Sequence, residues 1–321
     1  MTSATRPAAS PTTTSPGGAT RPRAGLLPVL LVMGSIVSLQ VGSGYATTLF
    51  DRAGSTGVTT LRLGLAALVM LLVTRPRLRS WSRPQWRVVL MFGLSLALMN
   101  SFFYAAIARI PFGIALAFEF LGPLGLAAAL SRRPRDFLWV ALALAGVATI
   151  GVHNADAGSL DLLGVLFALL AASAWAAYIV LGARVSTVVP GHQGLAAALA
   201  TAAVMLLPFG IVTSGGAVLS LGLLLPGLAV ALFSSVLPYT FEMQALKTMP
   251  KKMFSILLAL EPAAGVLTGA LMLGQHLDPL TIAAIGVVVV AGIGATLGRP
   301  DRPARRGLRR RRANPGDAVL T

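Results

Sequence analysis

The chain has 321 residues, of which 55% are hydrophobic and only 11% are charged, so its composition predicts a protein that is largely embedded in a membrane. A net charge of +16 would suit a nucleic-acid-binding protein, but the basic residues lie between apolar runs and after Gly298, without interleaved aromatic residues, which excludes that class. The chain has no cysteine, which excludes disulfide bonds, a thiol nucleophile and cysteine-based metal sites.

The first 25 residues are rich in Ser, Thr, Pro and Ala and cannot bury apolar surface, so we expect a disordered cytoplasmic tail. The apolar run that follows is too long for a removable signal peptide and lacks a small-residue cleavage site. We therefore interpret it as a retained first membrane span.

Runs of apolar residues long enough to cross a bilayer predict an all-α membrane protein with ten transmembrane helices. The predicted spans are 27–48, 56–74, 87–108, 111–130, 136–153, 161–184, 194–213, 224–246, 252–274 and 278–297.

The distribution of basic residues predicts the orientation of these spans. If the N-terminus is cytoplasmic, all of the 26 Lys and Arg residues except Arg52, Arg62 and Arg109 fall on the cytoplasmic side. Because Lys and Arg are enriched in cytoplasmic loops, both termini should lie inside a plasma (inner) membrane. The basic tails, including 299–321, are expected to contact anionic membrane lipid, and we predict no binding to nucleic acid.

Two segments in the two halves of the chain resemble each other. In the first, a turn at Pro111 leads to Glu119 and a proline, and in the second, a turn at Pro250 leads to Glu261 and a proline. Because each half contains five spans, the halves should have opposite orientations in the membrane, which is typical of inverted-repeat transporters. This predicts two five-helix repeats, 26–154 and 155–298, with both carboxylates near the membrane midplane.

Three blocks of the sequence resemble the drug/metabolite transporter superfamily, in particular its threonine and homoserine exporter branch with two EamA-type repeats. The blocks are MNSFFYAAIARIPFGIALAFEFLGPL (99–124), SRRPRDFLW (131–139) and PYTFEMQALKTMPKKMFSILLALEPAAGVLTGALMLGQ (238–275). The resemblance implies ten helices, an inner-membrane location and export of small metabolites such as amino acids. Relatives often carry Gly-Glu where this chain has Gly274 and Gln275, so a role for that carboxylate is not expected here.

Glu119 and Glu261 are the leading candidates for binding a substrate or a proton, because ionisable residues inside membranes are usually functional. With no Arg or Lys expected at their depth, loss of hydration should favour their neutral forms. A substrate ammonium group could then displace a proton, which would couple export to proton entry. The alternative is a pair of neutral, hydrogen-bonded carboxyl groups that only hold helices together.

Six further polar residues are candidates for the same site, each with a structural alternative. Glu242 and Tyr239 share a helix face and could line a cavity, or instead pair with a basic loop and anchor at the interface. Asn100 and Tyr104 also share a face, and with Gln40 they could hold a substrate or form hydrogen bonds between helices. Arg62 could bind a substrate carboxylate or extend to the outer interface.

The sequence contains no zinc-protease motif and no glycine-rich phosphate loop, and its three histidines fall at predicted loops or helix ends. We therefore predict neither an enzyme nor a bound metal or cofactor. The leading function is secondary active export of amino acids such as threonine or homoserine. The alternatives are export of drugs or other metabolites, and a membrane scaffold that transports nothing.

Overall fold

The computed structural model describes residues 26–130, 134–156, 161–189, 192–249 and 251–297, and these residues form helices and short connections without strands. The predicted tails, 1–25 and 299–321, lie outside the described residues.

The helices of the first half are α1 (Leu26–Thr47), α2 (Phe50–Thr74), η1 (Leu78–Ser80), α3 (Arg83–Ile107), α4 (Phe112–Glu119), α5 (Leu121–Ala129) and α6 (Pro134–Asp156). Those of the second half are α7 (Leu162–Val188), α8 (Gln193–Thr213), η2 (Ala217–Leu219), α9 (Leu221–Ala231), η3 (Leu232–Val236), α10 (Leu237–Thr248), α11 (Lys251–Leu258), α12 (Glu261–Leu273) and α13 (Pro279–Leu297).

Within the described ranges, seven helices are long and apolar enough to cross a membrane. Three further apolar helices are shorter: Phe112–Leu126, Phe137–His153 and Pro279–Ala295. Each of the ten predicted spans overlaps one of these segments, so the prediction of an all-α multi-pass membrane protein is confirmed. The count of ten includes the three shorter segments and is not exact. The predicted start of the second span was wrong, because α2 begins at Phe50 and continues through a kink at Gly54 (φ 66°).

Three predicted spans are interrupted, although the sequence predicts each of them as one continuous helix. Span 111–130 divides into α4 and α5, and span 252–274 divides into α11 and α12. Span 224–246 contains the π-helical turn η3 between α9 and α10.

A proline follows each interruption. Proline has no N–H, so it leaves the carbonyl four residues earlier without its helical partner. For Pro123 that carbonyl belongs to Glu119, where α4 ends, and for Pro262 it belongs to Leu258, where α11 ends. The carboxylates therefore lie at the helix breaks: Glu119 is the last residue of α4 and Glu261 is the first residue of α12.

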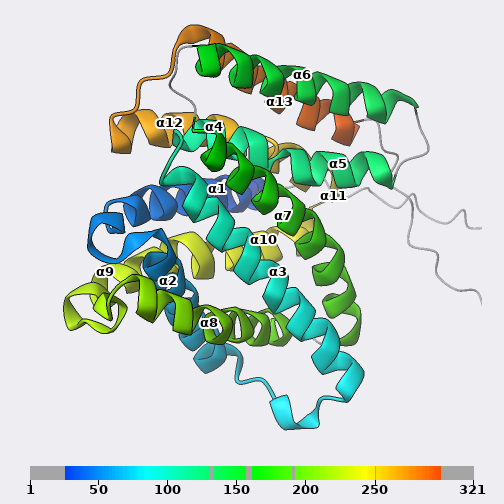
Figure 1. The fold of residues 1–321 in the computed structure, drawn as a ribbon. Coiled ribbons are helices and arrows are strands. Elements are labelled where there is room, and N and C mark those ends of the chain that lie inside the picture. Colours follow the sequence, from blue (N-terminus) through cyan, green and yellow to red (C-terminus); the bar gives the residue numbers. More distant parts are fainter. Residues whose placement is uncertain (1–25, 131–133, 157–160, 190–191, 250, 298–321) are drawn as a thin grey trace, which may run out of the picture.

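The helices pack in a bundle around α4, of which every residue is buried. In Figure 1, α6 and α13 lie side by side and α3 crosses the bundle between α7 and α8. On the other side of the bundle, α1 packs against α10 and α12, while α2 packs against α8 and α9. The breaks of the two interrupted carboxylate-bearing spans meet because α4 packs directly on α12.

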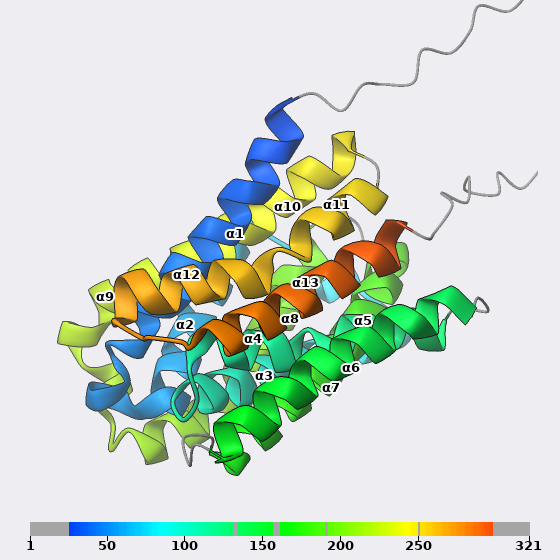
Figure 2. The ribbon, with the colours of Figure 1, turned by 90° about the horizontal axis from the view of Figure 1, so that it is seen from above.

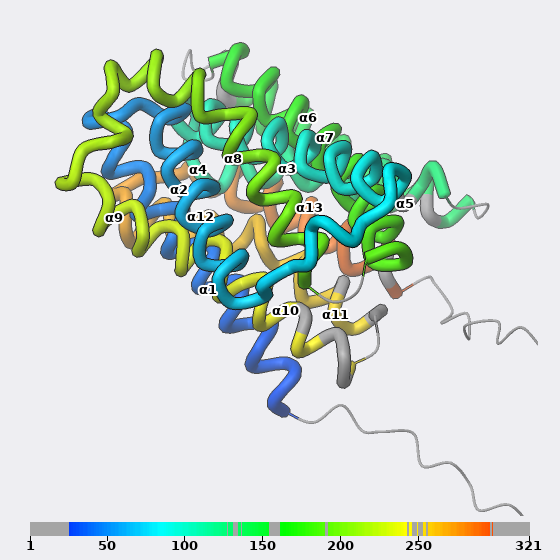
Figure 3. Tube along the Cα trace, turned by 90° about the horizontal axis from the view of Figure 1, so that it is seen from below, coloured from blue at the N-terminus to red at the C-terminus, as the bar shows by residue number. Residues whose placement is uncertain are grey.

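The bundle has two distinct ends. In Figure 2 the start of α1, the end of α10, the start of α11 and the end of α13 lie at one end, and the connection from α12 to α13 lies at the other. Figure 3, from the opposite side, also places α9 and α11 at different ends of the molecule. We call the end with the α12–α13 connection the closed end, because two ion pairs lie there, and the other the open end, because the cavity lining extends to it.

Candidate functional site

A cavity of about 640 Å³ lies inside the bundle and brings together residues from most of its helices. Seven of the eight predicted site residues line it: Gln40, Arg62, Asn100, Glu119, Tyr239, Glu242 and Glu261. The lining continues to Phe254 on α11 and Ala295 near the end of α13. The cavity therefore reaches the open end of the bundle.

Glu119 and Glu261 face this common cavity although 142 positions separate them in the sequence. Their exposed fractions are 7% and 6%. The hydrogen bonds among the described residues include none made by either carboxylate. The alternative, a pair of carboxyl groups that hold helices together by hydrogen bonds, stays a prediction.

Arg62 does not extend to the outer interface, so that structural alternative was wrong. Its side chain is 3% exposed and points inward, where Nη2 donates to the carbonyl of Ser234 at 2.7 Å and Nε donates to Oγ of Ser235 at 3.1 Å. The expectation that no basic residue lies near the two glutamates was wrong as well, because Arg62 lines the same cavity. Sequence could not reveal this position, because it depends on how α2 is rotated against η3.

Tyr104 is the one predicted site residue that is not part of the cavity lining. It is fully buried, and the Arg62 guanidinium lies over its ring, 5.2 Å from the centroid. Its ring also meets Phe50 edge to face, at 5.8 Å between centroids. The predicted shared face of Asn100 and Tyr104 is therefore divided: Asn100 faces the cavity and donates from Nδ2 to the Leu96 carbonyl at 2.8 Å, whereas Tyr104 supports Arg62.

Gln40 and Glu242 join α1 to the broken helices of the second half. Gln40 donates from Nε2 to the backbone carbonyl of Glu261 at 3.3 Å, and Ser35 donates its hydroxyl to Oε1 of Glu242 at 2.8 Å. Tyr239, one turn before Glu242, lines the same wall of the cavity as the sequence predicted. Gln40 therefore faces the cavity and also connects two helices, and its role in holding a substrate stays a prediction.

Aromatic side chains form the apolar part of the lining. Trp175 and Tyr178 on α7 line the cavity and also pack on neighbouring rings. Tyr178 stacks on Phe92 with ring centroids 4.9 Å apart, and Trp175 meets Phe120 edge to face at 6.1 Å.

Four serines that bond to cavity residues or to the π turn were missed by sequence reasoning. Ser35 and Ser38 on α1, and Ser234 and Ser235 on η3, are indistinguishable by type from the many small residues of the chain. The available signal was Pro238, since it leaves the Ser234 carbonyl four residues earlier in need of a partner from elsewhere.

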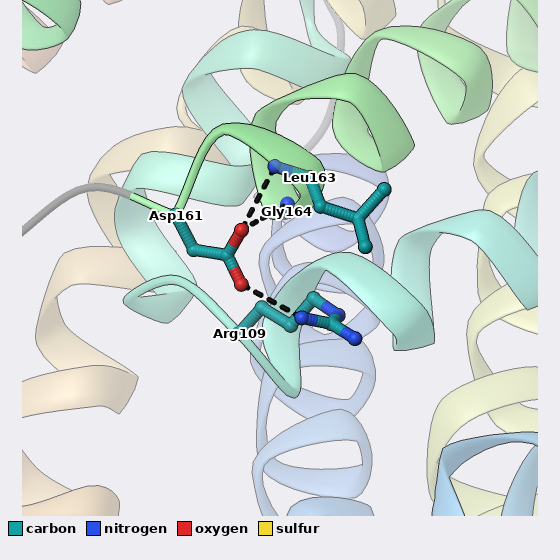
Figure 4. A network of polar contacts seen from close by, with 4 residues as sticks. All are labelled: Arg109, Asp161, Leu163 and Gly164. Atoms are coloured by element: carbon teal, nitrogen blue, oxygen red, sulfur yellow. Dashed lines mark hydrogen bonds and ion pairs between the residues drawn. The ribbon is translucent and has the colours of Figure 1, made fainter.

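Two ion pairs lie at the closed end, and each joins the first half of the chain to the second. Arg109 and Asp161 are 2.8 Å apart, and Asp161 also accepts hydrogen bonds from the backbone N–H groups of Leu163 and Gly164 at the start of α7 (Figure 4). The hydrogen bond from Arg109 lowers the pKa of the Asp161 carboxyl. The first pair therefore fastens the α3–α4 turn to the start of α7.

The second pair joins His153 on α6 to Asp278 at the start of α13, with 3.1 Å between Nε2 and Oδ1. Hydrogen bonds from Thr281, and the nearby His153, lower the pKa of Asp278. No group of three or more His, Asp and Glu residues in the described ranges could hold a metal ion.

Apolar spanning helices around a charged cavity whose lining extends toward one end of the bundle form the architecture of a membrane transporter. A family model described as the EamA-like transporter family matches residues 162–297. The threonine/homoserine exporter RhtA of Salmonella typhimurium is 38% identical over 280 residues, which cover 87% of this chain and 95% of the relative. The RhtA of Escherichia coli K12 is 37% identical over 271 residues, which cover 84% and 92%. The chain therefore belongs to the EamA-like transporter family.

A known crystal structure has a similar fold, with a TM-score of 0.57 at 20% identity, over 84% of this chain and 96% of that one. The comparisons confirm the resemblance predicted from the three sequence blocks. They also agree with the prediction that the chain is not an enzyme, because the family and its relatives are transporters. The substrate is accordingly a small molecule.

Proposed function

We propose that this protein exports amino acids across the inner membrane and that threonine and homoserine, the substrates named for its relatives, are its first candidate substrates. Export would proceed by alternating access, in which the cavity is exposed first to one side of the membrane and then to the other.

The observation that carries this proposal is the charge distribution of the cavity. One cavity of about 640 Å³ is lined by one guanidinium group, that of Arg62, and by three carboxylates, those of Glu119, Glu242 and Glu261. None of the ion pairs among the described residues joins Arg62 to any of them. A free amino acid carries one carboxylate and one ammonium group, so it can pair with both kinds of group at once.

These charges suggest a role for each residue. Arg62 would bind the substrate carboxylate, and Glu119 and Glu261 would bind the ammonium group or a coupling proton. The remaining polar lining would fix the orientation of the substrate: Gln40, Asn100, Tyr239 and Glu242. Tyr104 would act by supporting Arg62 from behind.

Proton antiport is the coupling that this arrangement favours. A carboxyl group in a low-dielectric site stays protonated and neutral unless a positive group stabilises its charged form. Binding of the substrate ammonium group and binding of the proton therefore exclude each other. Export of an amino acid would then be accompanied by entry of a proton.

The two halves of the chain would be the inverted repeats 26–154 and 155–298. Helix packing supports this, because contacts recur when first-half helices are exchanged for second-half ones. Thus the contact of α3 with α7 has its counterpart in the contact of α1 with α10. The contacts of α4 with α12 and of α6 with α13 each join counterpart helices of the two halves. The distribution of Lys and Arg supports a cytoplasmic location of both termini, with the open end facing the cytoplasm and the basic tails near anionic lipid.

Transport by the purified full-length protein in liposomes tests the proposal. We expect radiolabelled threonine to be taken up and unlabelled threonine and homoserine to compete, while the hydrophobic cation tetraphenylphosphonium does not. Competition by the cation alone would favour a drug exporter. If none of these compounds is taken up, and cells with E119Q or E261Q behave like cells with the wild-type protein, the result would favour a scaffold.

A pH gradient tests the coupling separately. If transport is proton antiport, a gradient that is alkaline on the substrate side should accelerate uptake, because protons then leave the far side in exchange for substrate, and the reverse gradient should slow it. Uptake that is indifferent to the imposed gradient would contradict antiport and leave amino-acid transport intact.

A further inference from the structure

The inference concerns how Arg62 is held, and it rests on the proposed function of this cavity. The π-helical turn η3 precedes Pro238, the second residue of α10. In an α-helix the N–H of residue 238 would bond to the carbonyl of Ser234, and in a π-helix it would bond to that of Phe233. Proline provides this N–H to neither carbonyl.

Side chains of two other helices bond to these two carbonyls. Ser38 on α1 donates its hydroxyl to the Phe233 carbonyl at 2.6 Å, and Arg62 on α2 donates Nη2 to the Ser234 carbonyl at 2.7 Å. In a membrane an unsatisfied backbone carbonyl is costly, so these contacts stabilise the π turn. They also fix the guanidinium of Arg62 at a defined place.

The rest of the surroundings of Arg62 hold it in the same orientation. Nε donates to the hydroxyl of Ser235, and the guanidinium plane is supported by the Tyr104 ring. Nε and Nη2 form one edge of the planar guanidinium, and η3 occupies that edge. No hydrogen bond within the described ranges uses Nη1, so the edge between Nη1 and Nη2 is available for bidentate binding of a carboxylate.

We infer that Pro238 and Ser235 are positioning residues that make the cavity selective for substrates with a carboxylate. Pro238 acts through what it lacks, because residue 238 has no N–H to bond to the Phe233 or Ser234 carbonyl, and Ser38 and Arg62 bond to these carbonyls instead. Ser235 fixes the second nitrogen of the same edge. Together they present the other edge of Arg62 to the cavity, in which Glu119 and Glu261 provide the negative charge for the ammonium group.

The test compares threonine with threoninol, an amine in which a hydroxymethyl group replaces the carboxylate. Competition of each compound with labelled threonine is measured in liposomes containing the full-length protein or a variant. P238A introduces an N–H that competes for the Ser234 carbonyl, and S235A removes the partner of Nε. Both should reduce the preference for threonine over threoninol about tenfold, which corresponds to the loss of one hydrogen bond to a charged group.

S38A is the matched control. It removes a serine hydrogen bond to the same π turn, but Ser38 does not contact Arg62 through this bond and does not line the cavity. We expect S38A to lower stability and keep the preference for threonine. If P238A does not fold, S235A carries the comparison alone, because Ser to Ala leaves the helix backbone unchanged.

The outcomes separate the inference from the function on which it rests. A wild-type protein without any preference for threonine over threoninol would overturn carboxylate binding by Arg62 and the positioning role together, whereas lack of threonine uptake would overturn the proposed function. A wild-type preference that S235A and P238A retain, or that S38A reduces as much as they do, would overturn the positioning role and leave the proposed amino-acid transport in place.

Discussion

The two interrupted spans, α4–α5 and α11–α12, share the same kind of break but place their carboxylates differently. Each ends a helix at a carbonyl that a proline leaves without its partner, and each places a carboxylate at the break beside the cavity. They differ in the side of the break on which the carboxylate lies. Glu119 is the last residue of α4, whereas Glu261 is the first residue of α12.

This difference matters because the two ends of a helix have opposite electrostatic character. The N-terminus of a helix stabilises negative charge and the C-terminus destabilises it. The two carboxylates are therefore not equivalent, although the sequence presents them as counterparts. Under the proposed transport function, we expect Glu261 to meet the substrate ammonium group as an anion and Glu119 to carry the proton.

The largest expected effects come from removing each charge in turn. E261Q should weaken threonine binding by about 2 kcal/mol or more, because a charged pair in a buried site loses one partner. This is about a thirtyfold loss of affinity, measured by competition in liposomes. E119Q should retain threonine exchange between the two sides and lose the response to a pH gradient.

D51N is a suitable control for these variants, since Asp51 is exposed at the start of α2 and does not line the cavity. If E119Q and E261Q lose the same property to the same extent, the two breaks are equivalent and the argument from helix ends is wrong.

The crossing of α4 and α12 gives the next effect. A Cβ atom added at Gly113 would lie 2.8 Å from a Val266 methyl carbon and 3.1 Å from its backbone Cα and N, none of which can move freely. G113A should therefore lower stability by about 1–3 kcal/mol, measured by thermal unfolding in detergent. G265A should cost less, because its added Cβ meets the end of the flexible Leu116 side chain.

G125A provides the control for the glycine variants. No heavy atom lies within 4 Å of a Cβ at Gly125, so the change should be neutral or slightly stabilising through helix propensity. Equal destabilisation by all three variants would mean that the close crossing of the two helices does not set the cost.

A smaller effect is expected at the start of α4. Oε1 of Gln275 accepts a hydrogen bond from the backbone N–H of Phe112 at 3.0 Å, so a residue that follows α12 caps the other interrupted span. Q275A should lower stability by about 1 kcal/mol. Q275E keeps the acceptor and adds negative charge near a helix N-terminus, so it should be at least as stable as the wild type. A stable Q275A would show that this connection is dispensable.

The smallest effect concerns the exposed ion pair between Arg109, in the α3–α4 turn, and Asp161. The pKa of Asp161 is lower in the folded protein, so its contribution is fully present above the ordinary Asp value of about 3.9 and is lost as the pH falls through the lowered value. The difference in thermal stability between wild type and D161N should therefore be constant near neutral pH and shrink only in strong acid.

Asn is a good helix N-cap, so D161N removes the charge and keeps the cap of α7, whereas D161A removes both. A difference between wild type and D161N that grows as the pH falls would have the wrong sign for this ion pair.

The amino-acid sequence by itself determined the membrane class, the approximate spans and the two central carboxylates. These follow from local properties: the free energy of placing apolar or charged side chains in hydrocarbon depends on residue type and on position within a run. Of the eight residues that the same reasoning placed in the cavity, seven line it. Polar residues in apolar spans face protein or water rather than lipid.

Only the tertiary structure decided which helices break and what holds Arg62. Pro208 lies inside the continuous helix α8, so a proline alone does not determine an interruption. At Pro238 the break is stabilised by Ser38 and Arg62, which come from helices almost 200 positions away in the sequence. Tyr104 was wrongly placed in the cavity for the same reason. Rotation and crossing of packed helices depend on all of their contacts together, and no single segment of sequence contains them.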